Sequence, residues 1–239
     1  MTGAVADSPR LVRDEQGLAL VGGGMTVRAD FAALLPRARS GRLGQELLVR
    51  AARVRGVEAP RALDATAGLG EDAFLLAAAG FEVELYEREA AIAALLRDAL
   101  ARATASENPQ LAAIAARMHL HEGDSVAALR ALAAAAGSTD PVAPAPPDVV
   151  YLDPMFPARR KSAAVKKKLQ LMQQLEQPAT DEEAAVLLEV ARAARPRKVV
   201  VKRPAKGPWL AGVKPSYSVE GKAVRFDVLV VPELRPFGA

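Results

Sequence analysis

The chain contains no cysteine and only two histidines, His119 and His121. The lack of cysteine excludes disulfide bonds, thiolate metal sites and cysteine nucleophiles. The two histidines alternate within a short stretch that we expect to be a strand, a pattern typical of side chains on a strand face rather than of metal ligands. We therefore expect no metal site.

Long hydrophobic runs are also missing. No apolar run approaches the roughly 20 residues that a membrane-spanning helix needs. The amino terminus does not show a basic region followed by an apolar one, the pattern of a secretory signal. We therefore expect a cytoplasmic protein with no membrane partner. With 239 residues, of which 51% are hydrophobic and 25% charged, the composition is that of a globular chain with a sizeable core.

Charge is unevenly distributed along the chain, although the net charge is only +4. Residues 154–175 and 190–219 contain no acid, yet they carry 14 of the 32 lysines and arginines. Such segregation is typical of proteins that bind a phosphate backbone, although two solvated basic faces without a partner are the simpler alternative. The residues that we expect to contact RNA are Arg159, Arg160, Lys161, Lys166, Lys167, Lys168, Lys202 and Arg203.

The pattern of apolar residues divides the chain into two parts. We expect residues 1–58 to form a small amino-terminal subdomain. Within it, residues 18–27, which contain a glycine triplet, predict a hairpin, and residues 45–55 predict a helix. In residues 59–239 strands alternate with helices, which predicts a parallel sheet with right-handed crossovers. The predicted strands are 61–65, 81–86, 118–121, 148–152 and 198–202, followed by a hairpin of 216–220 and 224–231. The predicted helices are 71–79, 89–103, 125–136 and 181–194.

This order of elements predicts an α/β fold with a mostly parallel, seven-stranded sheet. It is the layout of the Rossmann-like class I methyltransferases, although spacing alone does not distinguish them from other doubly wound folds. The terminal hairpin would add the antiparallel part of the sheet.

A glycine-rich motif, DATAGLGEDA, leaves the first of these strands and enters a helix. Gly68 and Gly70 let the backbone turn sharply and approach a ligand closely. The motif fits the dinucleotide-binding fingerprint, so it is compatible with a nicotinamide cofactor as well as with S-adenosylmethionine. Asp64, which opens the motif, favours S-adenosylmethionine because a carboxylate suits the cationic methionine end better than a pyrophosphate.

Acidic residues follow two further strands. Glu87, with Arg88 beside it, ends the second strand and is placed to accept hydrogen bonds from both hydroxyls of a ribose. Asp124 and Ser125 follow the third strand, where an adenine amino group would be recognised. Each acid alone is also compatible with a helix cap. Acids at successive strand ends favour a ligand site, because doubly wound sheets bind ligands at that edge.

The fourth strand ends in YLDPMFP. This sequence resembles the Asp/Asn-Pro-Pro-aromatic loop of methyltransferases that act on amino nitrogens, with Met155 in place of the second proline. Hydrogen bonds from an aryl amine to the Asp153 carboxylate and the Pro154 carbonyl would direct its delocalised lone pair toward the methyl donor. Phe156 would stack on the base. We therefore expect Asp153, Pro154 and Phe156 to be catalytic.

Together these motifs resemble the bacterial ribosomal RNA small subunit methyltransferase J family. The resemblance covers roughly residues 22–231 and lies in DATAGLGEDAF, YERE, VVYLDPMFP, KSAAVKKK, VVVKRP and RFDVLV. It implies methylation of guanine N2 in 16S ribosomal RNA, with the RNA or a small-subunit assembly particle as partner. It also implies that the cofactor is S-adenosylmethionine, bound at Glu71, Asp72, Glu87, Arg88, Asp124, Ser125 and Asp153.

Three alternatives remain open at this point. The same enzyme class could act on another amine, such as a transfer RNA guanine, adenine N6 or a protein amide. A nicotinamide-dependent oxidoreductase would need a tyrosine–lysine or histidine proton relay, and the sequence offers no convincing one. A non-catalytic RNA-binding module on a methyltransferase fold would have no need for both Asp153 and Phe156.

Overall fold

The central sheet of the molecule is seven-stranded and mostly parallel, as predicted. The computed structural model describes residues 8–136, 142, 144–154, 171, 174–175 and 179–232. Strands β4 to β8 run parallel, and β10 is antiparallel to both of its neighbours. The spatial order is β6 (Met118–Glu122), β5 (Glu82–Glu87), β4 (Arg61–Asp64), β7 (Val149–Leu152), β8 (Lys198–Pro204), β10 (Val224–Val230) and β9 (Tyr217–Glu220).

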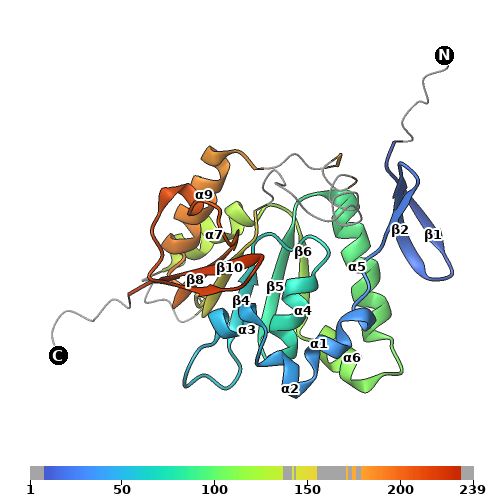
Figure 1. Cartoon of the computed structure of the whole chain (residues 1–239), viewed down its shortest axis with the longest axis horizontal. Coiled ribbons are helices and arrows are strands. Elements are labelled where there is room, and N and C mark those ends of the chain that lie inside the picture. The colour runs from blue at the N-terminus through green and yellow to red at the C-terminus, as the bar shows by residue number, and fades with distance from the viewer. Residues whose placement is uncertain are drawn as a thin grey trace, which may run out of the picture.

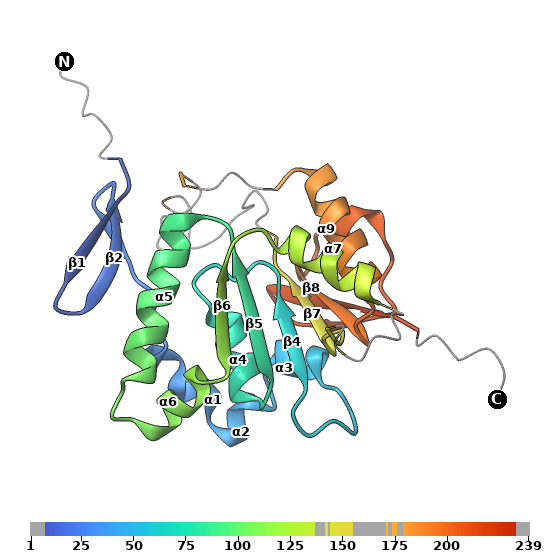
Figure 2. The ribbon, with the colours of Figure 1, turned by 180° about the vertical axis from the view of Figure 1, so that it is seen from behind.

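Helices cover both faces of this sheet (Figures 1 and 2). One face packs against α3 (Leu47–Ala52), α4 (Glu71–Ala78), α5 (Ala90–Thr104) and α6 (Pro109–Ala115), and the other against α7 (Ser125–Ala135) and α9 (Asp181–Ala193). Successive side chains of a strand point to opposite faces. In β7, Val149 and Tyr151 therefore enter the first core, while Val150 and Leu152 enter the second. This burial on both faces explains why β7 is apolar throughout.

Local capping explains where several helices begin. Thr180 and Glu183 form a reciprocal capping box at the start of α9, and Asp124 accepts the Val126 N–H at the start of α7. Asn108 and Pro109 begin α6, a helix that the sequence analysis did not predict. Among the described residues, no helix has the length and apolar character needed to cross a bilayer.

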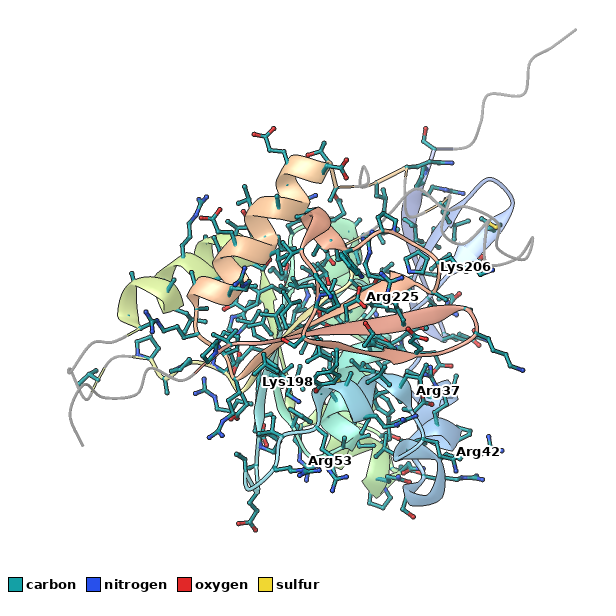
Figure 3. All side chains as sticks on the ribbon, turned by 60° about the vertical axis from the view of Figure 1, so that its left-hand side comes forward. Arg37, Arg42, Arg53, Lys198, Lys206 and Arg225 are labelled. Atoms are coloured by element: carbon teal, nitrogen blue, oxygen red, sulfur yellow. The ribbon has the colours of Figure 1, made fainter. Side chains whose placement is uncertain are left out.

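The antiparallel edge of the sheet contains a buried ion pair. Arg225, on β10, is 6% exposed, and its Nε and Nη2 donate to the two carboxylate oxygens of Asp227 (Figure 3). Its Nη1 donates to three backbone carbonyls of residues 204–207. A buried guanidinium needs such full satisfaction. These contacts attach residues 204–207, at the end of β8 and in the loop after it, to β10.

The amino-terminal part forms a second, antiparallel sheet and three short helices. The sheet consists of β1 (Arg10–Asp14), β2 (Gly17–Gly22) and β3 (Met25–Val27), and the helices include α1 (Leu35–Ala38) and α2 (Ser40–Leu43). The β2–β3 hairpin was predicted, whereas β1 was not. The predicted helix at 45–55 is shorter, because the chain becomes extended after α3.

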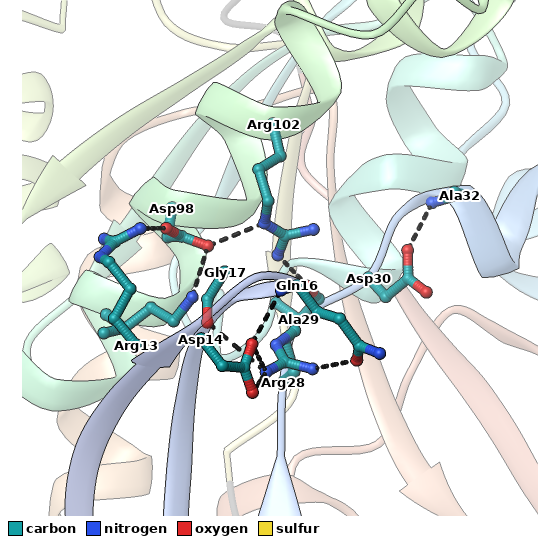
Figure 4. A network of polar contacts seen from close by, with 11 residues as sticks. Arg13, Asp14, Gln16, Gly17, Arg28, Ala29, Asp30, Ala32, Asp98 and Arg102 are labelled. Carbon is teal, nitrogen blue, oxygen red and sulfur yellow. Dashed lines mark hydrogen bonds and ion pairs between the residues drawn. The ribbon is translucent and has the colours of Figure 1, made fainter.

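Asp98, on α5, anchors this sheet to the main body (Figure 4). It accepts hydrogen bonds from Arg13, Arg102 and the Leu18 N–H. Burial alone would raise the pKa of Asp98, but these donors outweigh it and lower the pKa. Amino-terminal residues such as Leu20 belong to the same core as α4 and α5. The boundary between residues 58 and 59 stays a prediction.

Candidate active site at the carboxyl edge of the sheet

A cavity of about 670 Å³ opens at the carboxyl ends of the parallel strands. Its walls come from the ends of β4 to β8 and from α9. This edge is where doubly wound sheets bind ligands, and the volume is typical of a ligand site. The cavity brings together these predicted site residues: Asp64, Gly68, Glu71, Asp72, Glu87, Arg88, Asp124, Ser125, Asp153, Pro154 and Lys202.

The glycine-rich loop forms one wall. Gly68 has a φ of 54°, and a Cβ built on it would have no neighbour within 4 Å. Because Gly68 lines the cavity, a ligand can approach its backbone closely. The loop is held by backbone donors, since the Gly68 N–H donates to Glu87 Oε2 at 2.8 Å and the Thr66 N–H donates to Asp64 Oδ1 at 3.0 Å.

Gly70 does not line the cavity, although the sequence analysis placed it at the cofactor. It is the N-cap of α4 and has a left-handed φ of 75°. A Cβ at this position would lie 2.7 Å from Leu96 Cδ1 and 3.1 Å from the Phe31 ring. The close packing and the positive φ, rather than ligand contact, explain the glycine here.

Glu87 lies at the β5 end of the cavity and is 6% exposed. Its Oε2 accepts the Gly68 N–H and its Oε1 accepts the Glu89 N–H, both at 2.8 Å. Each carboxylate oxygen has more than one lone pair, so the group can accept hydrogen bonds from a ligand as well as from these N–H groups. Two neutral donors and a buried position make Glu87 a well-oriented acceptor.

The β6 end carries Asp124 and Ser125. Asp124 is exposed, lines the cavity and caps α7 through the Val126 N–H at 2.9 Å. Asp124 therefore caps a helix, the alternative that the sequence left open, and it also faces the cavity. Ser125 is 6% exposed at the first position of α7. The Tyr86 ring, which also lines the cavity, stacks on His121 with centroids 4.6 Å apart.

Four polar side chains meet at the β7–β8 end of the cavity. Lys202, on β8, places its Nζ 2.6 Å from Asp72 Oδ2 and 2.9 Å from Asp153 Oδ2. The Tyr151 hydroxyl donates to the same Asp72 oxygen at 2.6 Å. The Asp153 N–H donates to Thr66 Oγ1 at 2.7 Å, so both the main chain and the side chain of Asp153 are held.

The charges in this cluster reinforce one another. Burial alone would lower the pKa of Lys202, but the carboxylates of Asp72 and Asp153 outweigh it and raise the pKa above the usual value. Lys202 therefore remains an ammonium group. Burial, together with the charges of Asp72 and Asp153, raises the pKa of Tyr151 well above its usual value, so its hydroxyl remains a donor.

Asp64 is 1% exposed at the end of β4. Burial, reinforced by the charges of Asp72 and Asp153, raises its pKa to about 8 against the opposing effects of the Thr66 N–H and Lys202. At neutral pH this carboxyl group is therefore mainly protonated. A cationic ligand nearby would favour its ionised form.

The lining of the cavity is strongly acidic. Among the described residues, eight carboxyl side chains line it, against the two basic side chains of Arg88 and Lys202. The acids beyond those already described are Glu182 and Glu183, at the start of α9. Such a lining attracts a cation and repels a pyrophosphate, which argues against a nicotinamide dinucleotide.

The remaining predictions concern Phe156 and the residues expected to contact RNA. Phe156 and most residues expected to contact RNA lie outside the described residues: Arg159, Arg160, Lys161, Lys166, Lys167 and Lys168. The Lys202 side chain is 27% exposed and engaged by two carboxylates. Arg203 is 3% exposed, and its Nε donates to the Pro208 carbonyl at 2.8 Å. Both side chains are thus engaged within the protein, and their contact with RNA stays a prediction.

Some lining residues were not anticipated from the sequence. Tyr86 and Ile92 contribute from β5 and α5, and Val186 and Leu187 contribute from α9. The capping box at Thr180 was a usable signal, because it places the first turn of α9 at the same sheet edge. Nothing in the local sequence marks Tyr86 or Ile92 as site residues.

Comparison with known proteins agrees with this geometry. A family model described as a putative SAM-dependent methyltransferase matches residues 6–231. The ribosomal RNA small subunit methyltransferase J of Pseudomonas aeruginosa is 46% identical over 204 residues, which cover 84% of this chain and 73% of that protein. The protein of the same name from Neisseria gonorrhoeae is 42% identical over 226 residues, covering 95% of this chain and 83% of that protein.

A solved structure gives the same result. The crystal structure of a SAM-dependent methyltransferase from Neisseria gonorrhoeae superimposes with a TM-score of 0.72 at 33% identity, covering 100% of this chain and 87% of that chain. The family model and the relatives confirm S-adenosylmethionine as the cofactor. The acidic cavity, the glycine-rich loop and these similarities lead to one conclusion: the chain belongs to the ribosomal RNA small subunit methyltransferase J family of S-adenosylmethionine-dependent enzymes.

Proposed function

We propose that this methyltransferase modifies the exocyclic N2 amine of a guanine in 16S ribosomal RNA, either free or within a small-subunit assembly particle. The names of the relatives support a small-subunit ribosomal RNA as substrate. The observation that carries the proposal is the position of Asp153, whose carboxylate lines the cavity beside Pro154 and is held 2.9 Å from Lys202. The proposed substrate places the enzyme in the cytoplasm.

The chemistry of an aryl amine explains why an oriented acceptor is needed. The amine lone pair is delocalised into the ring, so the nitrogen is a poor nucleophile. A hydrogen bond from the amine to Asp153, and a second to the Pro154 carbonyl, would orient the lone pair for attack. The Asp153 carboxylate would also stabilise the positive charge that develops on the nitrogen as the new N–C bond forms. The methyl–sulfur bond of the cofactor would break as the N–C bond forms. The nitrogen would then pass one proton to the Asp153 carboxylate, which releases it to water and leaves a neutral secondary amine.

Lys202 would act through Asp153 rather than on the base. Its ammonium contacts the Asp153 and Asp72 carboxylates, and Asp72 in turn accepts from Tyr151. This chain of contacts limits the rotation of the Asp153 side chain before the substrate arrives. Lys202 is therefore a positioning residue in this mechanism.

The residues of the cavity suit S-adenosylmethionine. Glu87 would accept the ribose hydroxyls, Asp124 and Ser125 lie where the adenine amino group would be recognised, and Asp64 faces the cationic methionine end. When bound, the cofactor supplies a methyl group activated by a sulfonium. The open space at Gly68 and the acidic lining are the observations that support this assignment.

The target guanine must be unpaired or flipped out of its stack to reach the cavity. Phe156 would stack on it. The basic residues of the segment that follows, Arg159 to Lys168, remain our candidates for contacts with RNA phosphates. Replacing Lys166, Lys167 and Lys168 by alanine should flatten the salt dependence of RNA binding by roughly 0.7–0.9 in log–log slope per lost contact.

Nucleoside analysis tests the proposal. The purified protein is incubated with radiolabelled S-adenosylmethionine and 16S ribosomal RNA or immature small subunits, and the digested RNA is separated by chromatography. We expect label in N2-methylguanosine, and one guanine of 16S RNA should lack this modification in cells that lack the gene. Label in N6-methyladenosine would refute the guanine assignment and leave the enzyme class intact. Label in transfer RNA alone would refute the 16S assignment.

A further inference from the structure

The short helices before the main domain carry arginines that lack an acidic partner. Their exposed arginines form no ion pair with any described residue: Arg39, Arg42, Arg50, Arg53 and Arg55. Residues 31–58 contain only two acids, Glu46 and Glu58. Glu46 is already engaged, because both its oxygens accept from Arg37 at 2.8 Å. The positive charge of this segment is therefore largely uncompensated.

Some arginines elsewhere on the surface are paired. Arg13, Arg97 and Arg117 each lie beside a carboxylate, on β1, α5 and the start of β6. A paired guanidinium has less charge to offer a second anion. An unpaired one can form a bidentate contact with a phosphate.

Some of these arginines share a face with two lysines of β8 and the following loop. Figure 3 shows Arg42, Arg53, Lys198 and Lys206 on the same side of the molecule, and we call these four residues the basic face. Lys198 begins β8, and its Nζ donates to the carbonyls of Ala51 and Arg53 and to the Tyr217 hydroxyl, none of which is charged. Lys206 is exposed. Arg225, in the same view, is buried and paired with Asp227, so we leave it out.

The basic face leads to the cavity. Lys206 follows β8 at the edge where Lys202 enters the cavity, whereas Lys198 lies at the opposite end of that strand. A strand rises about 3.3 Å per residue, so the seven residues of β8 span about 20 Å. This length accommodates several phosphates of one RNA strand. The face is also well anchored, since α3 packs on β8, β9 and β10.

We propose that the basic face binds the phosphate backbone of the substrate RNA, on the side of the cavity away from the α7 and α9 helices. This inference rests on the proposed function for the identity of the RNA. It adds a binding surface in the amino-terminal part, apart from the lysine-rich segment that follows Asp153. The face holds the RNA by charge and selects no base.

The test compares two variants with the same loss of charge. In the first, Arg42, Arg53 and Lys206 are replaced by glutamine. The control carries Arg117→Gln, Arg130→Gln and Arg192→Gln, of which Arg117 is half-exposed just before β6 and the other two are exposed on α7 and α9. Binding of a 16S ribosomal RNA transcript is measured by fluorescence anisotropy between 50 and 300 mM salt, and S-adenosylmethionine binding by calorimetry.

We expect the basic-face variant to lose roughly 2 units of the log–log salt slope, since each phosphate contact contributes about 0.7–0.9. The control should keep the wild-type slope, and both variants should bind the cofactor normally. Equal slopes for the two variants would overturn this proposal while leaving the proposed function standing. A wild-type protein that binds neither the transcript nor immature small subunits would overturn the RNA partner itself, and with it both proposals.

Discussion

The two ends of the cavity hold their carboxylates in different ways. At the β5–β6 end, Glu87 and Asp124 accept hydrogen bonds from backbone N–H groups. At the β7–β8 end, Asp72 and Asp153 are held by the ammonium group of Lys202, and Asp72 also by the Tyr151 hydroxyl. The first arrangement is built from the main chain and the second from side chains of α4, β8 and the end of β7, which lie far apart in the sequence.

This difference has a chemical consequence. Backbone donors belong to every sequence that folds this way, so the β5–β6 end is a stable receptor for neutral hydroxyl and amino groups. The ion-pair cluster depends on four particular side chains and responds to charge. We therefore expect substitutions at the β7–β8 end to change turnover, and substitutions at the β5–β6 end to change cofactor affinity.

The largest effect is expected for Asp153→Ala. Losing one oriented partner of the transition state typically lowers the rate by about 10²–10³. The kcat is measured at saturating cofactor and RNA, with circular dichroism to confirm the fold and calorimetry to measure cofactor affinity. Asp124→Ala, at the other end, is the matched control and should keep most of its kcat. A kcat of Asp153→Ala near that of the wild type would refute the mechanism.

Glu87→Gln should mainly weaken cofactor binding. Hydrogen bonds to a charged acceptor contribute roughly 1.5–3 kcal/mol, so we expect the Kd for S-adenosylmethionine to rise about 10- to 100-fold. The glutamine NH2 would also face the N–H of Gly68 or Glu89, and two donors cannot bond to each other. Calorimetry measures the Kd. An unchanged Kd accompanied by a lower kcat would contradict the assignment of cofactor affinity to the β5–β6 end and of turnover to the β7–β8 end.

The backbone-held end was predictable from the sequence because its signals are local. The glycine motif, the strand ending at Glu87 and the cap at Asp124 are each contained in a few consecutive residues. The alternation of strands and helices also predicted all seven strands of the main sheet in nearly their observed bounds. For Asp64, Glu87 and Asp153, the rule that parallel strands end at one edge was sufficient to bring the side chains together.

The side-chain-held end was not predictable in the same way. Lys202 belongs to an acid-free segment, so its charge was assigned to RNA contact, whereas the structure places it between two acids. Only the register of β7 and β8, with Leu152 opposite Val201, brings Lys202 next to Asp153. Burial of Arg203 likewise depends on the loop that returns to it at Pro208. Such contacts join residues far apart in the chain, and composition does not reveal them.

A double-mutant cycle would measure how strongly Lys202 acts through Asp153. Neighbouring residues in one network are typically coupled by about 0.5–3 kcal/mol, so Lys202→Met should lower kcat clearly in the wild type and little in the Asp153→Ala background. Lys202→Arg, which keeps the charge, should retain more activity. Urea unfolding of each variant separates loss of turnover from loss of stability. Fully additive effects of the two substitutions would show that Lys202 does not act through Asp153.

A pH dependence tests the electrostatics of the β4 strand end. Burial raises the pKa of Asp64 from 3.8 to about 8. The folded protein therefore holds this proton more tightly than the unfolded chain. The stabilising contribution of Asp64 is complete below about pH 4 and declines as the pH rises to about 8, by at most about 1.4 kcal/mol per pH unit.

Asp64→Asn removes this titration while its Oδ1 can still accept the Thr66 N–H. The free energy of unfolding of the variant, relative to the wild type, should therefore increase between pH 5 and pH 8 in urea titrations. Cofactor binding should show the complementary trend, since a cationic ligand favours the ionised carboxylate: wild-type affinity should rise from pH 6 to pH 8.5, and the rise should be weaker in Asp64→Asn. A stability difference that stays constant with pH would mean that Asp64 titrates as an ordinary aspartate. It would refute the claim that burial keeps this carboxyl group protonated at neutral pH.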